Sequence, residues 1–109
     1  MKFKIRRKEF PQDSSITLKG NKLAFAEYVS SFENADKECV VFYSGNNLDE
    51  VVNNSAKIII VNRNLELNSY LPKDKLIVSC KNPMSLFVDI VSKNYDNKEY
   101  ANGIEKFIN

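Results

Sequence analysis

The sequence predicts an α/β domain, with a small mixed sheet that has a parallel βαβ core and antiparallel strands at its N-terminus. Three aliphatic runs, at 39–43, 57–61 and 75–80, lack the polar alternation of half-buried strands. Such runs are typical of strands that are covered on both faces. Segments with helical periodicity separate or follow them, as in βαβ units. The chain of 109 residues has the size of a single domain.

The N-terminal segment alternates apolar and basic residues. Met1, Phe3 and Ile5 stand between basic neighbours, and five of the sixteen basic residues fall within the first eight positions. Alternation with period two favours a half-buried strand with lysines on its outer face. The alternative is a basic arm that binds nucleic acid or an anionic surface. Further strands are predicted at 16–18 and 23–28, which completes the antiparallel N-terminal part.

The first helix is predicted to begin after Asn47. Asparagine is a favourable N-cap, and Glu50 stands three residues later, as in a capping box. Leu48, Val51 and Val52 have the i, i+3, i+4 spacing of an apolar helix face. This helix would connect the first two buried strands.

The last helix is predicted to open at Asn82 and Pro83, because asparagine caps helices and proline is favoured at the first helical position. Its apolar stripe would consist of Met84, Phe87, Val88, Ile90, Val91 and Tyr95. Residues 1–95 would then form one α/β domain, and 96–109 a tail or linker. The predicted core of this domain includes Val41, Ile59, Ile60, Ile77, Val78, Phe87 and Ile90.

Composition narrows the range of functions. The chain has no histidine, which excludes Ser-His-Asp and Cys-His catalysis, and the isolated chain is not expected to be catalytic. Cys39 and Cys80 lie in apolar runs without a CxxC pattern, which favours buried free thiols over a disulfide or a metal pair. A net charge of +2 gives no expectation of nucleic acid. No signal peptide or membrane-spanning run is found, so a cytoplasmic location is expected.

One segment has the features of a binding site, with no metal or cofactor expected in it. A strand ends there and a helix N-terminus follows, and such ends of α/β sheets bind ligands and anions. Aromatic faces could stack a base, and side-chain amides could bind its polar edge. The alternative is an ordinary turn beside a core aromatic. The candidate residues are Phe42, Tyr43, Ser44, Gly45, Asn46, Asn47 and Leu48.

Several segments resemble, in order, the N-terminal domain of UDP-3-O-(3-hydroxyacyl)glucosamine N-acyltransferase, an enzyme of lipid A biosynthesis. Residues 29–35, V-S-S-F-E-N-A, are similar to the family's V-A-S-L-x-x-A, and 41–43, V-F-Y, to its L-T-F. Residues 55–61, S-A-K-I-I-I-V, resemble A-x-A-V-I-V, and 81–87, K-N-P-M-S-L-F, resemble x-N-P-x-x-x-F/Y. Residues 103–108, G-I-E-K-F-I, resemble the G-I-H-x-x-A-x-I at the start of its β-helix, with Glu105 in place of histidine.

The resemblance implies a fold like the first domain of the Mur ligases and a role in holding the uridine of a UDP-sugar. In the family, acyl transfer from acyl carrier protein takes place in a trimeric β-helix, which this chain lacks, so the isolated domain is expected to be a monomer. The family holds uracil with an aromatic residue, an asparagine three positions on and a tyrosine three positions further. Phe42 matches the aromatic residue, whereas Gly45 and Leu48 occupy the other two positions. The alternative is an interaction or assembly domain that has lost nucleotide binding.

Overall fold

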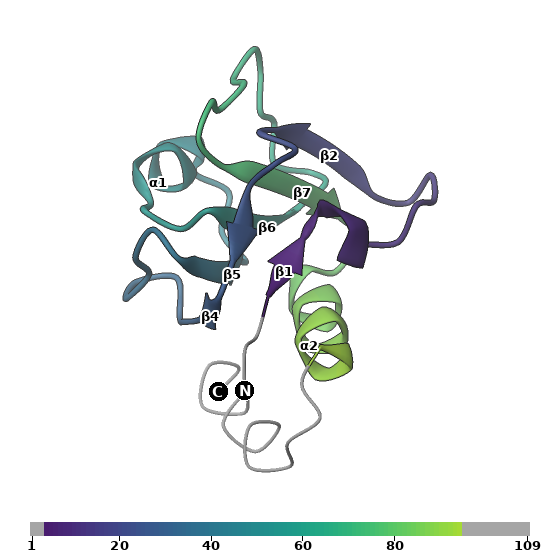
Figure 1. Cartoon of the computed structure of the whole chain (residues 1–109). Coiled ribbons are helices and arrows are strands. Elements are labelled where there is room, and N and C mark those ends of the chain that lie inside the picture. The colour runs from purple at the N-terminus through teal and green to yellow at the C-terminus, as the bar shows by residue number, and fades with distance from the viewer. Residues whose placement is uncertain (1–3, 95–109) are drawn as a thin grey trace.

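The computed structural model describes residues 4–94, and these form a mixed α/β domain (Figure 1). Its main sheet has five strands in the order β2-β7-β6-β5-β4, of which four are parallel and β2 is antiparallel to β7. The strands are β2 (Thr17–Gly20), β4 (Tyr28–Val29), β5 (Cys39–Tyr43), β6 (Ile58–Asn62) and β7 (Leu76–Cys80). The predicted parallel core with antiparallel additions is therefore confirmed, and the Mur-ligase-like arrangement stays a prediction.

Helices cover both faces of this sheet. Helix α1 (Leu48–Asn53) packs on one face and α2 (Pro83–Lys93) on the other, as Figure 1 shows. A second, two-stranded sheet pairs β1 (Ile5–Arg6) with β3 (Phe25–Ala26), and the short 3₁₀ helix η1 (Arg7–Glu9) follows β1. This small sheet lies on the same side as α2, because Ile5 and Ala26 belong to the core beneath that helix.

The core has two halves, one on each side of the sheet. Along β6, Ile58 and Ile60 contribute to the half beneath α2, while Ile59 and Val61 contribute to the half beneath α1. This alternation follows from the period of two along a strand. The predicted core is confirmed, since all seven of its residues are buried, namely Val41, Ile59, Ile60, Ile77, Val78, Phe87 and Ile90.

The prediction of one strand at 23–28 is wrong, because the chain passes there from one sheet to the other. Residues 25–26 pair with β1, whereas Tyr28 and Val29 form β4 at the edge of the main sheet. The N–H groups of Glu27 and Tyr28 both donate to the carbonyl of Glu38, which turns the chain toward β5. As a result β4 runs parallel to β5, and is not one of the expected antiparallel additions.

The two ends of the predicted domain are described only in part. The predicted N-terminal strand is seen at Ile5, whereas Met1 and Phe3 lie outside the described residues. Tyr95 and the predicted tail at 96–109 also lie outside them.

Both helices begin at the predicted caps, but one detail differs. The Asn82 side chain accepts from the N–H of Ser85 at 3.2 Å, as expected. The side chain of Asn47 accepts from the N–H of Asp49. The predicted capping box with Glu50 is wrong, because the N–H of Asn47 donates instead to the hydroxyl of Tyr43.

Two residues assigned to apolar helix faces are exposed instead. Val52 is 38% exposed, because Val51 is the one residue of the six-residue helix α1 that is fully buried. Met84 is 40% exposed in the first turn of α2.

We expect Phe87→Ala to lower the free energy of unfolding by roughly 3–5 kcal/mol, because the ring is fully buried at the centre of the half-core beneath α2. Met84→Ala on the same helix is the matched control, and should change stability far less. Urea denaturation followed by circular dichroism measures both. Equal losses for the two variants would contradict the burial of Phe87.

We expect two thiols that react with a thiol reagent only after unfolding. Cys39 starts β5 and Cys80 ends β7, and both are buried. They belong to opposite halves of the core, so the sheet separates them and they cannot form a disulfide. Burial raises the pKa of both thiols, which keeps the reactive thiolate scarce near neutral pH. One fast-reacting thiol in the native protein would contradict this.

Candidate functional site

A hollow of about 260 Å³ lies at the carboxyl ends of β4 and β5. We name it the carboxyl-edge hollow. It collects aromatic rings, hydroxyl groups and two carboxylates from the end of β5, the segment after β4 and the first turn of α1. Its lining residues are Ser31, Phe32, Glu33, Phe42, Tyr43, Ser44, Gly45 and Glu50.

Tyr43 fixes the shape of this hollow. Its ring packs against Phe32 with the centroids 4.6 Å apart. Its hydroxyl accepts from the N–H of Asn47 at 3.0 Å and lies 3.3 Å from the carbonyl oxygen of the same residue. Burial raises the pKa of the Tyr43 hydroxyl, and the neighbouring Glu50 carboxylate raises it further. The hydroxyl therefore stays protonated near neutral pH and ties the end of β5 to the start of α1.

Phe42 reaches the same hollow from the other side of the sheet. Successive residues of a strand point to opposite faces, so Phe42 lies on the face of α2 while Tyr43 lies on the face of α1. The Phe42 ring is half-buried and packs against Phe87 with centroids 5.1 Å apart. Both aromatic residues can therefore line the same hollow only because it lies at the end of β5, where both faces of the strand are accessible.

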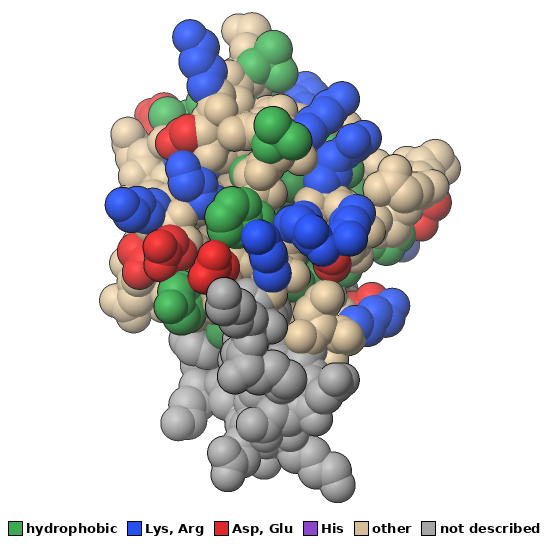
Figure 2. Space-filling view, viewed as in Figure 1, with side chains coloured by type: hydrophobic (Ala, Val, Ile, Leu, Met, Phe, Trp, Pro, Cys, Tyr) green, Lys and Arg blue, Asp and Glu red, His purple; other side chains and the backbone are tan. Residues whose placement is uncertain are grey.

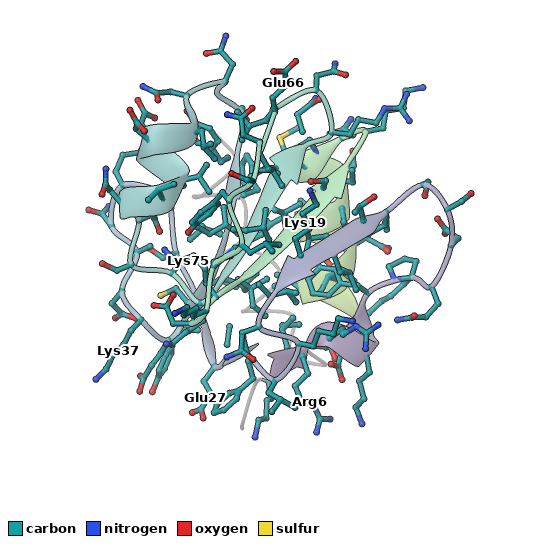
Figure 3. All side chains as sticks on the ribbon, turned by 90° about the horizontal axis from the view of Figure 1, so that it is seen from above. Arg6, Lys19, Glu27, Lys37, Glu66 and Lys75 are labelled. Atoms are coloured by element: carbon teal, nitrogen blue, oxygen red, sulfur yellow. The ribbon has the colours of Figure 1, made fainter. Side chains whose placement is uncertain are left out.

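The C-terminus of α1 holds the opposite wall in place. The side-chain amide of Asn54 donates to the carbonyl of Phe32 at 2.8 Å. The ammonium of Lys75, which Figure 3 labels, is buried against the carbonyl oxygens of Val52, in the last turn of α1, and of Asn54, its C-cap. Burial lowers the pKa of Lys75, while the charge of Asp74 opposes that shift. Lys75 is therefore a structural cation that caps α1.

The N-terminus of α1 has few free donors. The N–H of Asn47 is bound by Tyr43, that of Asp49 by the Asn47 side chain, and that of Glu50 by the Asn47 carbonyl. Asp49 and Glu50 also place two negative charges in the first turn. Because a phosphate needs free N–H groups and positive potential, this geometry favours hydroxyl-bearing groups over a diphosphate at that point.

The structure brings together four of the seven candidate residues, namely Phe42, Tyr43, Ser44 and Gly45. The other three, Asn46, Asn47 and Leu48, do not line the hollow, and the amide oxygen of Asn47 is used as a helix cap. Four lining residues escaped the sequence analysis, and these are Ser31, Phe32, Glu33 and Glu50. Predicting that β4 pairs in parallel with β5 would have placed the segment after β4 beside the end of β5, and so would have located the first three of them.

A second hollow, of about 330 Å³, lies at the amino ends of the parallel strands. Lys37, Lys57, Glu27, Glu38 and Asp74 give it both signs of charge. Within residues 4–94, no three histidine, cysteine, aspartate or glutamate side chains are grouped so as to hold a metal ion. No helix in that part of the chain has the length and hydropathy needed to cross a membrane.

Comparison with known proteins gives no relative: no family model, curated protein or solved structure matches the chain significantly. The candidate site therefore has to be judged on its own geometry.

We expect Gly45→Ala to destabilise the domain by about 1–3 kcal/mol, the usual range for overpacking. A Cβ at Gly45 would lie 2.5 Å from Cζ of Tyr43, whose hydroxyl is bonded to Asn47 and cannot move freely. The matched control is Asn46→Ala at the exposed neighbouring position. Thermal melts of both variants measure the difference, and equal midpoints would show that the Tyr43 ring can yield.

Proposed function

We propose that this domain recognises the nucleoside part of a UDP-sugar in the carboxyl-edge hollow. It would act as the substrate-recognition domain of an N-acyltransferase of lipid A biosynthesis that takes a 3-hydroxyacyl chain from acyl carrier protein. The observation that supports this most is the convergence of aromatic rings, hydroxyls and carboxylates at the carboxyl ends of two parallel strands. Such edges are where open α/β sheets bind ligands. The sequence resemblance supplies the identity of the ligand.

The lining of the hollow suits a ribonucleoside. A uracil ring can stack on the aromatic wall formed by Phe32 and Tyr43, or on the accessible side of Phe42. The carboxylates of Glu33 and Glu50 can accept hydrogen bonds from ribose hydroxyls, and the Ser44 hydroxyl can bind the uracil edge. Carboxylates repel phosphate, so the diphosphate would leave the hollow toward the neighbouring strands.

Two exposed cations follow the neighbouring strands at this edge. Arg63 comes directly after β6, and Lys81 directly after β7. Neighbouring strands lie about 4.8 Å apart, so these side chains begin roughly 5 and 10 Å from the end of β5. A diphosphate attached to a nucleoside in the hollow can span that distance. In this proposal Arg63 and Lys81 neutralise the diphosphate charge.

Acyl transfer itself would need a partner domain. The resemblance assigns that step to a trimeric β-helix and its histidine, and this chain has no histidine. The domain would contribute substrate binding alone.

A second candidate is the interaction or assembly domain with no nucleotide. Leu23 and Phe25 line the hollow at the amino ends of the parallel strands and are 88% and 42% exposed, and Tyr28 in β4 is 55% exposed. Large exposed apolar side chains of this kind are typical of contact surfaces. Gly45 and Leu48, in place of the family's asparagine and tyrosine, also favour this candidate.

Titration with UDP, followed by amide shifts, tests the proposal. We expect shifts at 31–33, 42–45 and 63 and a dissociation constant in the millimolar range, about 4 kcal/mol of binding free energy, because two family contacts are missing. Cytidine monophosphate is the control ligand and should give weaker shifts. Absence of shifts at several millimolar UDP would leave the assembly domain as the function.

A matched pair of variants tests the role of Glu50. Glu50→Gln should weaken UDP binding several-fold relative to Asp49→Asn, because both remove one negative charge from the first turn of α1 and only Glu50 lines the hollow. Equal affinities for the two variants would show that Glu50 makes no contact with ribose.

A further inference from the structure

Several basic residues lie close together near the N-terminal strands. Figure 2 shows a group of Lys and Arg side chains over the part of the surface where β1 and β2 lie in Figure 1, and other cations are spread over the same face. An open groove of about 290 Å³ lies within this region. Arg6, Arg7, Lys8 and Lys22 line it together with Gln12. We name it the basic groove.

The basic groove continues into an adjoining hollow of about 380 Å³. Arg7, Gln12 and Lys22 line both, so the two form one elongated depression. The second hollow runs along residues 16–18, at the start of β2. Its acidic residue, Asp13, is engaged by the N–H and hydroxyl of Ser15. The two adjoining hollows together have room for more than a single phosphate.

Most cations of the groove are not neutralised within the described part of the chain. Glu9 pairs with Arg6, at 3.6 Å between the guanidinium and the carboxylate. Arg7, Lys8 and Lys22 form no ion pair with any described residue. The Nε of Arg7 is buried and has no hydrogen-bond partner among residues 4–94. The buried Nε cannot itself reach a phosphate, but Arg7 lines the groove, and its terminal N–H groups can donate to phosphate oxygens.

An exposed aromatic side chain, Phe25, lies beside the groove. Arg6 pairs directly with Phe25 across the β1–β3 ladder, so the groove and this ring are neighbours. Phe25 is 42% exposed, and the ammonium of Lys4 lies 4.2 Å from its ring centroid. Tyr28, further along the chain, is 55% exposed. Cations that follow a backbone, next to rings that can stack bases, are the features of surfaces that bind single strands.

We propose that the basic groove and Phe25 bind single-stranded nucleic acid, with phosphates on Arg7, Lys8 and Lys22 and a base stacked on Phe25. The exposed ring favours a single strand over a duplex, because the bases of a duplex are already stacked on each other. It also favours nucleic acid over an anionic lipid surface, which would need charge but no ring face. This site lies apart from the carboxyl-edge hollow and shares no residue with it.

The test uses the full chain and a fluorescein-labelled, mixed-sequence single strand of about twelve nucleotides, a length within the range of such sites. Fluorescence anisotropy is measured at several salt concentrations. We expect binding at low salt that weakens as salt rises. Lys8→Gln/Lys22→Gln should weaken it and reduce the slope of log affinity against log salt by about 1.4, since two phosphate contacts are lost. Both lysines are exposed, so the fold should be kept.

The matched control is Arg63→Gln/Lys81→Gln, which removes the same charge from the carboxyl edge and should leave oligonucleotide affinity unchanged. Phe25→Leu keeps an apolar side chain in β3 but removes the ring face. It should lower affinity about tenfold at every salt concentration without changing the slope.

Three results would overturn the proposal. The first is no anisotropy change at low salt with about 100 μM protein, a concentration that reaches or exceeds the dissociation constants of typical nonspecific binding. The second is equal weakening by the two double variants, which would mean attraction to overall charge. The third is full affinity in Phe25→Leu with equal binding to a duplex or to anionic vesicles, which would mean a general polyanion surface. UDP titration at the other edge is unaffected by any of these, so the two proposals fail separately.

Discussion

The burial of β5, β6 and β7 on both faces is the constraint on which the rest of the structure depends. Alternate residues of each strand enter different halves of the core, so that Ile58 and Ile60 face α2 while Ile59 and Val61 face α1. A shift of one residue in the pairing would exchange the two sets. Each face also needs its own cover, because neither apolar surface could remain in water. Helix α2 and the β1–β3 sheet cover one face, whereas α1 and the loop carrying Leu65 and Leu67 cover the other.

Tyr43 connects this core to the candidate site. Its ring completes the half-core beneath α1, and its hydroxyl binds the backbone of Asn47, where that helix begins. The turn between them passes so close to the ring that Gly45 has no room for a Cβ. The same contacts use up donors at the helix N-terminus, which moves any anionic part of a ligand away from α1. The packing of Tyr43 therefore limits which ligand groups the carboxyl-edge hollow can bind.

The sequence was sufficient for the elements with continuous apolar runs and clear caps, such as β5 and α2. Their hydrophobic pattern and local hydrogen bonds are contained within each segment. The strands before Val29 are two to four residues long, and their partners are distant in sequence, so no local pattern could assign them. For the same reason, only half of the residues that line the carboxyl-edge hollow could be predicted. Phe42 to Gly45 belong to one strand end, whereas Phe32 and Glu50 join them only through the β4–β5 pairing and the path of α1.

The net charge is distributed unevenly along the chain. Residues 1–22 carry a net charge of +5, against +2 for the whole chain, so the rest carries −3. In the fold, β1 belongs to the two-stranded sheet beneath α2, and β2 is the edge strand of the main sheet beside β7. Since β2 is antiparallel to β7, with Gly20 opposite Leu76, Lys22 emerges at the amino edge of the parallel strands. The carboxyl-edge hollow lies at the other end of the strands, at β4 and β5, so the buried sheet stands between it and Lys22. A ligand at one edge could influence the other only by altering the register or twist of that buried sheet, which two-sided packing strongly resists.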